Sequence, residues 1–264
     1  MDSEAGFWRR ESRPELRGLV RGLYGYDERG AAMRELIEPA GLDVPLIVNF
    51  GTPFEIALGR RPEAGDGIRS FAAGLFAGPV IMNSDGGAQC IQVNFTPVGG
   101  RLFYGMPLGE LADRMIALDD LSDPGITELA DRLAELNSWQ ARLDLTERFV
   151  ARRLRRAPAI DPEAAWAYGR IESRGGNLRI RGLCSALGWS RRRLAERFQH
   201  EFGLPPKAIA RIARFEAAET MALEAGRPRW ADIAAACGYS DQAHLTREFS
   251  ELAGRSPSAF RAAA

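Results

Sequence analysis

The sequence predicts an α+β multidomain chain: a β-rich N-terminal domain, a helical linker and an all-α C-terminal domain with two helix-turn-helix motifs. A short pattern occurs twice in the C-terminal part, about fifty residues apart. Residues 42–118 instead consist of short runs rich in β-branched and aromatic residues, broken by Gly, Pro, Asn and Asp. At 264 residues the chain is long enough for two domains.

The short runs of the N-terminal half predict a small β-sandwich or barrel. We expect strands at residues 46–50, 54–58, 71–76, 79–83, 89–95 and 101–104. Within residues 89–95, Ile91 and Val93 alternate with Gln92 and Asn94, so this strand is either half-buried or lines a polar-walled pocket. Residues 1–20 show no periodicity, and we expect their start to be loosely ordered.

Five polar residues of these runs are candidates for contact with a small molecule, because concave sites use a few polar groups in an apolar wall. They are Asn49, Asn83, Gln89, Gln92 and Asn94. The alternative is that they face solvent or pair with strand edges.

The distribution of histidine argues against catalysis in this half. Both histidines, His200 and His244, lie in the C-terminal part. A catalytic barrel holds its metal mainly through histidines, and a Ser-His-Asp triad needs one as well. We therefore expect no enzyme, no metal and no cofactor, although turnover of a metabolite by residues 1–160 alone would revive that alternative. A third alternative is an interaction module that binds a protein partner.

Cysteine usage and hydropathy indicate the compartment. Cys90, Cys184 and Cys237 form no CxxC pair, so neither a zinc ribbon nor a disulfide framework is expected. No apolar run approaches the ~18 residues of a membrane span, and the N-terminus lacks a signal-peptide core. The sequence therefore predicts a cytoplasmic protein without membrane contact.

Residues 108–121 and 126–156 are predicted to be helical. Apolar residues recur at roughly helical spacing in the second segment: Leu129, Leu133, Leu136, Leu143, Phe149, Val150 and Leu154. Two interpretations stay open, packing onto the β-rich domain or formation of a homodimer. We therefore expect a regulatory domain at residues 1–122, a helical linker at 123–160 and a C-terminal domain at 161–264.

The duplicated pattern predicts two helix-turn-helix motifs. The first copy has Gly188-Trp-Ser, Leu194, Phe198 and Gly203, and the second has Gly238-Tyr-Ser, Leu245, Phe249 and Gly254. The glycine after each apolar run suits a helix end with positive φ. Ser190, and Ser240 or Asp241, suit the N-cap of the following helix. The Leu and Phe of each copy are four residues apart, so they share one buried face. Residues 208–225 predict a single helix that separates the motifs.

The outward faces of the two second helices are polar, as a DNA-reading surface requires. The side chains are Arg191, Arg192, Ala195, Glu196 and Gln199 in the first and Gln242, Ala243, His244, Thr246 and Arg247 in the second. Charge is segregated in the same way. Residues 166–264 hold 16 Lys and Arg against 10 Asp and Glu, whereas residues 1–165 hold 19 against 25. The motif-bearing half is therefore the basic half, as phosphate neutralisation requires.

Residues 161–264 resemble the DNA-binding domain of the AraC/XylS family of bacterial transcription regulators. The most specific part is AAACGYSDQAHLTREF at residues 234–249, followed by AGRSPSAF at 253–260. The resemblance implies a sequence-specific regulator of double-stranded DNA whose two recognition helices enter successive major grooves, ~34 Å apart. It also implies a diverged cupin-like sensor domain for a small-molecule effector and, in an activator, contact with RNA polymerase.

The resemblance carries base-reading positions onto this sequence. They are Arg192, Ala195 and Glu196 in the first motif and Gln242, Ala243, His244 and Arg247 in the second. Gln pairs with adenine, Arg with guanine, Glu accepts from cytosine and Ala meets the thymine methyl. Glu196 departs from the long polar or basic side chains usual there and indicates selective rather than tight contact. If Arg255 contacts phosphate, its removal should weaken binding to all sequences alike.

Overall fold

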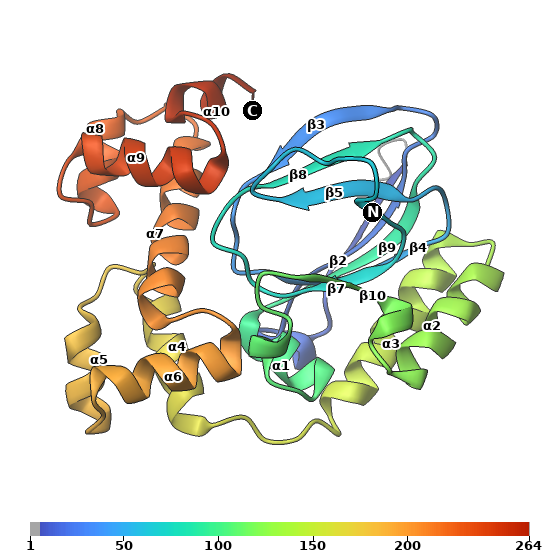
Figure 1. The fold of residues 1–264 in the computed structure, drawn as a ribbon, viewed down its shortest axis with the longest axis horizontal. Coiled ribbons are helices and arrows are strands. Elements are labelled where there is room, and N and C mark those ends of the chain that lie inside the picture. Colours follow the sequence, from blue (N-terminus) through green and yellow to red (C-terminus); the bar gives the residue numbers. More distant parts are fainter. Residues whose placement is uncertain (1–5, 264) are drawn as a thin grey trace.

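The structure, a computed structural model, describes residues 6–263 and has a β-rich part followed by an all-helical part (Figure 1). Residues 1–5, at the start of the segment expected to be loosely ordered, lie outside the described residues. Within residues 6–263, no helix is long and apolar enough to cross a membrane.

Two antiparallel sheets form the β-rich part. The larger has the order β1-β2-β9-β4-β7-β10, with bounds Phe7–Arg10, Val20–Asp27, Gln89–Phe95, Val44–Asn49, Phe71–Ala73 and Met115–Ala117. The smaller has the order β3-β8-β5-β6, with bounds Met33–Glu38, Val80–Ser84, Phe54–Leu58 and Gly67–Ile68. Figure 1 shows the smaller sheet lying over the larger one, so the predicted β-rich domain is confirmed.

Strand β9 lies inside the larger sheet, paired with β2 and β4, and shows the alternation predicted from its sequence. Ile91, Val93 and Phe95 are buried in the main core. Gln92 and Asn94 point to the other face, where they line a cavity. The period-two pattern is thus real, and it separates a packed face from a cavity face.

Two predicted elements of this half are wrong. Residues 101–104 belong to helix α1 (Pro97–Tyr104), because Thr96 caps it by accepting a hydrogen bond from Gly99 N and Pro97 occupies the first turn. Residues 108–121 are not one helix. They form the 3-10 turns η2 (Leu108–Glu110) and η3 (Leu118–Asp120) on either side of strand β10.

The first strand lies within the segment expected to be loosely ordered. Strand β1 pairs with β2, and its Trp8 ring stacks on Trp139 of helix α3 at 4.5 Å between centroids. A short 3-10 turn, η1 (Pro14–Leu16), follows β1. Aromatic packing from a segment more than a hundred residues away therefore orders this strand.

Helices α2 (Pro124–Glu135) and α3 (Trp139–Leu154) connect the two parts. Helix α3 packs against β2 and α1, and a side chain at Gly25 of β2 would collide with Trp139. The structure therefore bears out the interpretation that this segment packs onto the β-rich part.

Seven helices form the C-terminal part: α4 (Pro162–Glu172), α5 (Ile180–Leu187), α6 (Arg191–Phe202), α7 (Pro206–Ala222), α8 (Trp230–Ala236), α9 (Gln242–Ala253) and α10 (Pro257–Ala263). The pairs α5–α6 and α8–α9 are the two predicted helix-turn-helix motifs, and α7 is the predicted connecting helix. Leu194, Phe198, Leu245 and Phe249 are each 0% exposed. Gly188 and Gly238 have φ of 65° and 78°, the left-handed conformation expected of both turns.

Candidate DNA-binding surface and cavity of the β-rich part

Both second helices of the motifs begin with a side-chain cap. The Ser190 hydroxyl accepts a hydrogen bond from Arg193 N at 3.1 Å. In the second motif Asp241, not Ser240, is the cap, because its carboxylate accepts from His244 N at 2.7 Å. These caps fix where α6 and α9 start, and so fix which residues lie in the first turn.

On α6, the predicted outward residues Arg191, Arg192, Glu196 and Gln199 are exposed, and Ala195 is half-buried. Arg192 and Glu196 pair with each other, with 2.7 Å between Nε and Oε1. The two residues are one helical turn apart, and because both are exposed the ion pair contributes little to stability. Arg192 therefore has to exchange Glu196 for a base or phosphate in order to contact DNA.

Gln199 has a different environment from the residues at the start of α6. Its side-chain amide donates to the carbonyl of Gly203 at 2.6 Å, which closes the end of the helix. The backbone of Gln199 also lies so close to Gly109 of η2 that a Cβ at that glycine would be 2.6 Å from the Gln199 carbonyl oxygen. Gln199 thus sits beside the β-rich part, about 12 Å along the helix from Arg191.

On α9, Gln242, Ala243 and Arg247 are exposed, whereas His244 and Thr246 are half-buried. The ring of His244 is held by its neighbours: Nδ1 lies 3.2 Å from the Ser240 hydroxyl and Nε2 lies 3.4 Å from Glu248. Among the described residues, Gln242 and Arg247 make no side-chain hydrogen bond or ion pair within the protein. Their polar groups are therefore available for an external partner.

Helices α6 and α9 point in a common direction relative to the sheets. The end of α6 packs on η2, where Gly203 lies near the Leu108 carbonyl. The end of α9 reaches the smaller sheet, where Gly254 contacts Ile37 and Pro79. Both C-terminal ends thus face the β-rich part, and both N-terminal ends project away from it (Figure 1). The 17 residues of α7 stand between the two motifs and span about 25 Å.

Arg255 lies at the contact between the two parts rather than on the outward face. Its guanidinium donates to the Ile37 carbonyl at 2.9 Å and lies over the Phe260 ring. The sequence cannot reveal this role, because Ile37 is more than two hundred residues away. The conditional expectation of a phosphate contact is therefore replaced by a structural role.

A cavity of about 470 Å³ lies in the β-rich part, with Phe54, Ile56 and Phe71 in its apolar wall. Of the predicted ligand-facing residues, Gln92 and Asn94 line it and Asn49 and Asn83 do not.

Asn49 and Asn83 instead hold backbone in place. The Asn49 side-chain oxygen Oδ1 accepts from Gly51 N and Gln89 N, at 2.9 and 3.1 Å. Asn83 accepts from Glu35 N at 2.9 Å and donates to the Glu55 carboxylate at 3.1 Å. The structure therefore places only two of the five predicted ligand-facing residues at the cavity, and Gln89 is not one of them.

The two acidic residues of the cavity wall, Glu38 and Asp43, were not predicted from the sequence. They lie at the end of β3 and the start of β4, in a segment without a motif. The only signal in the sequence was an acidic residue next to a β-branched run on each side of Pro39-Ala-Gly-Leu42.

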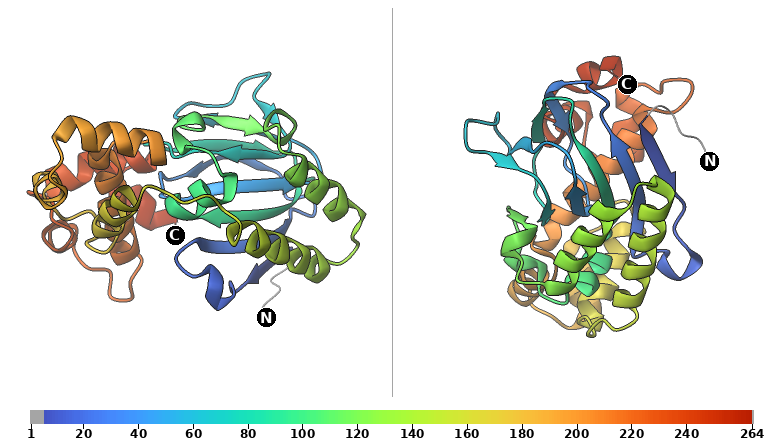
Figure 2. Two further views of the ribbon diagram at one scale, coloured as in Figure 1. Left: turned by 90° about the horizontal axis from the view of Figure 1, so that it is seen from below. Right: turned by 90° about the vertical axis from the view of Figure 1, so that its right-hand side faces the viewer.

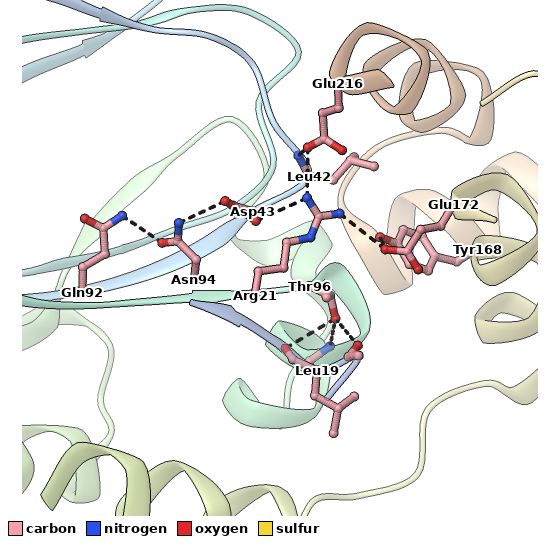
Figure 3. A network of polar contacts seen from close by, with 12 residues as sticks. Leu19, Arg21, Leu42, Asp43, Gln92, Asn94, Thr96, Tyr168, Glu172 and Glu216 are labelled. Carbon is pink, nitrogen blue, oxygen red and sulfur yellow. Dashed lines mark hydrogen bonds and ion pairs between the residues drawn. The ribbon is translucent and has the colours of Figure 1, made fainter. Parts of the chain in front are cut away.

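A chain of polar contacts leads from the cavity to the helical part (Figure 3). Gln92 donates to Asn94 at 2.8 Å, and Asn94 donates to the Asp43 carboxylate at 3.0 Å. Asp43 lies 3.5 Å from the Arg21 guanidinium, which in turn donates to Glu216 of α7 at 3.1 Å. Arg21 also reaches Glu172 of α4 at 3.4 Å.

Competing effects act on the pKa of Asp43 within this series of polar contacts. Burial raises the pKa of Asp43 to about 6, and the negative charges of Glu216 and Glu38 act in the same direction. Arg21 and the Asn94 amide oppose this by stabilising the carboxylate. The Asp43 carboxylate thus has the Asn94 amide at Oδ2 and the Arg21 guanidinium at Oδ1, and both stabilise its charged form.

Comparison with known proteins adds to this geometry. A family model described as a helix-turn-helix domain matches residues 183–263. No curated protein matches the chain. Among solved structures, ToxT from Vibrio cholerae is 12% identical, with a TM-score of 0.50 over 97% of this chain and 98% of that one.

Two other solved structures match over less of the chain. The C-terminal domain of AraT, a response regulator from Geobacillus stearothermophilus, is 22% identical, with a TM-score of 0.38 over 40% of this chain and 89% of that one. The xylose-binding transcription activator XylR is 18% identical, with a TM-score of 0.35 over 46% of this chain and 39% of that one. The matched segment, residues 183–263, contains both motifs, and the likeness to ToxT extends over the β-rich part. Residues 183–263 are therefore a helix-turn-helix domain, and the chain as a whole shares the two-part fold of ToxT.

Proposed function

We propose that this chain is a sequence-specific transcription regulator that reads double-stranded DNA with α6 and α9 in successive major grooves. The observation that carries the proposal is the common direction of the two capped helices, whose N-terminal turns project away from the β-rich part. Successive grooves are ~34 Å apart, and the connecting helix supplies a rigid spacer of the same order.

The side chains proposed to read bases are those available for an external partner in the first two turns of α6 and α9. In the second motif these are Gln242 and Arg247, which suit adenine and guanine respectively. In the first motif Arg192 reads a base once it has left Glu196, and Ala195 offers its methyl to thymine. Arg191 contributes a phosphate contact at the helix start, where a backbone with free N–H groups also favours anions.

The test is fluorescence anisotropy of the full chain with duplexes from its own upstream region and with a scrambled duplex, at matched salt. We expect the upstream duplex to bind more tightly, and Gln242→Ala or Arg247→Ala to cost ~1–3 kcal/mol on that duplex. The matched control is Arg132→Ala, an exposed arginine on α2, and this helix lies across the β-rich part from both motifs (Figures 1 and 2). This variant should leave the affinity unchanged. Equal affinity of the wild type for both duplexes would refute specific reading.

The β-rich part is proposed to be the sensor. Its cavity of about 470 Å³ falls within the ~300–1,000 Å³ range of small-molecule sites and has an apolar wall with a few polar groups. In this proposal the effector changes the affinity for DNA, an activator form contacts RNA polymerase, and no substrate is converted. Anisotropy with and without candidate effectors tests the sensor role, and light scattering of the full chain tests whether it forms the homodimer that the sequence left open.

A further inference from the structure

The charged residues of the cavity wall are all acidic. Glu38 and Asp43 are the only charged residues that line it, and no Arg, Lys or His does so among the described residues. The rest of the wall is largely apolar, and aromatic rings contribute much of it: Phe7, Tyr24, Tyr26, Phe54, Phe71 and Phe76. A carboxylate-bearing molecule would therefore meet two like charges and no cation.

Neither acidic side chain is fully satisfied within the protein. The Glu38 side chain makes no hydrogen bond or ion pair with any described residue and is exposed to solvent where it lines the cavity, although the protein around it raises its pKa through burial. Asp43 uses Oδ2 to accept from Asn94, whereas its Oδ1 is buried without a hydrogen bond. Unsatisfied carboxylate oxygens beside an apolar space are costly unless a donor or a positive charge compensates them.

We propose that the effector of the sensor domain is an organic cation, with an apolar body in the cavity and a protonated amine or guanidinium group between Glu38 and Asp43. The inference rests on the sensor role proposed above and deepens it by naming the class of ligand. The cationic group supplies hydrogen-bond donors to Glu38, which has none within the described protein, and to Asp43 Oδ1, which is buried without one. The aromatic faces of the wall attract the same charge through their π-electrons.

The location of the two acids also explains how binding of such a ligand affects the DNA-binding half. Both lie on the β3–β4 segment, residues 37–43, whose backbone is bonded to the helical part on its other side. Ala40 N donates to the Leu252 carbonyl at 2.8 Å, and Leu42 N donates to Glu216 at 2.7 Å. A cation at Asp43 also competes with Arg21, the side chain that joins Asp43 to Glu216 (Figure 3). A ligand in the cavity therefore alters the hydrogen bonds that α7 and α9 make with this segment.

The ligand class is tested by calorimetric titration of the full chain, near neutral pH, with three probes of equal chain length: octylamine, octanol and octanoate. The amine should bind about tenfold or more tightly than the alcohol, since hydrogen bonds to charged groups exceed those to neutral ones by about that factor, and octanoate should bind most weakly. Equal binding of amine and alcohol, tighter binding of octanoate, or no binding of the amine would each overturn the inference.

Variants assign the charge preference to the two acids. Glu38→Gln and Asp43→Asn should each weaken octylamine binding about tenfold and leave octanol binding unchanged, which also shows that the cavity is intact. The matched control is Glu35→Gln on the same strand, because Glu35 pairs with Arg61 outside the cavity. If neither cavity variant weakens the amine, the inference is wrong. Anisotropy with DNA is measured separately, in the absence of ligand. If the chain binds its DNA specifically but does not prefer the amine, only the proposed ligand class is overturned.

Discussion

Removal of Glu201 should uncouple the first motif from the β-rich part at a large cost in stability. The Glu201 carboxylate on α6 accepts from Arg101 Nε on α1 at 2.8 Å, and the two residues are 4% and 9% exposed. Loss of one partner of a buried pair leaves the other charge uncompensated and costs about 3–5 kcal/mol. Only one N–H···O contact joins the pair, and Arg101 Nη1 is buried without a partner, so we expect the lower end, about 3 kcal/mol.

Urea denaturation followed by tryptophan fluorescence measures this effect for Glu201→Ala. The double variant Arg101→Met/Glu201→Leu should recover most of the loss, since it removes both charges and keeps the volume. The control is Glu196→Ala on the same helix, whose side chain is 62% exposed and which should change the unfolding free energy by less than about 0.5 kcal/mol. A loss below about 1 kcal/mol for Glu201→Ala, or no recovery in the double variant, would show that the pair does not hold this interface.

Three further perturbations test the motifs and the electrostatics. Phe249→Ala should cost about 3–5 kcal/mol in urea denaturation, because the ring is 0% exposed and packs against Phe215, Trp230 and Phe260; a loss as small as that of a surface variant would contradict the packing. Ser190→Ala should cost about 1 kcal/mol and lower the thermal midpoint, and an unchanged midpoint would mean that the cap is not used. Burial raises the pKa of Glu219 from 4.5 to about 7, so the folded state binds this proton more tightly and stability falls as pH rises from about 4.5 to about 7. Glu219→Gln should therefore raise the thermal midpoint above pH 7 and leave it nearly unchanged near pH 4.5, and a uniform shift at both pH values would exclude the titration.

Elements with strong local signals were predictable from the sequence. Helix α6 begins at Arg191 and ends at Phe202 as expected, because a serine cap and a glycine with positive φ mark its ends. Strand β9 was predictable from its alternation. Residues 101–104 were not, because their β-prone side chains outweighed the Thr96-Pro97 start signal that lies four residues earlier.

The residues of the functional surfaces likewise include some that the sequence predicts and others that only the folded structure reveals. Exposure on α6 and α9 follows from helical periodicity, so the outward positions could be named from the sequence. The roles of Gln199 and Arg255 depend on Gly109 and Ile37, which only the folded chain brings near. Glu38 belongs to this second group, since an isolated glutamate at a strand end carries no sign that a cavity lies beside it.

The contacts between the two parts differ in strength at the two motifs, and this difference decides which motif can adjust to DNA. The first motif is held by the buried Arg101–Glu201 pair and by the close approach of Gly109 to α6. The second is held by hydrogen bonds to backbone groups, Arg255 to Ile37 and Ala40 to Leu252.

The backbone bond from Ala40 contributes about 1 kcal/mol and the charged bond from Arg255 about 1.5–3 kcal/mol, each less than the ~3–5 kcal/mol for loss of a partner in a buried charge pair. The second motif therefore shifts first when the recognition helices adjust to the spacing of the grooves. We therefore expect specific DNA to speed hydrogen exchange at the Ala40 amide while the amides around Glu201 stay protected. Faster exchange at α6 with an unchanged Ala40 amide would reverse the assignment. The release of Ala40 would occur in the same β3–β4 segment that carries Glu38 and Asp43, so occupancy of the cavity and engagement of the second motif act on one stretch of backbone.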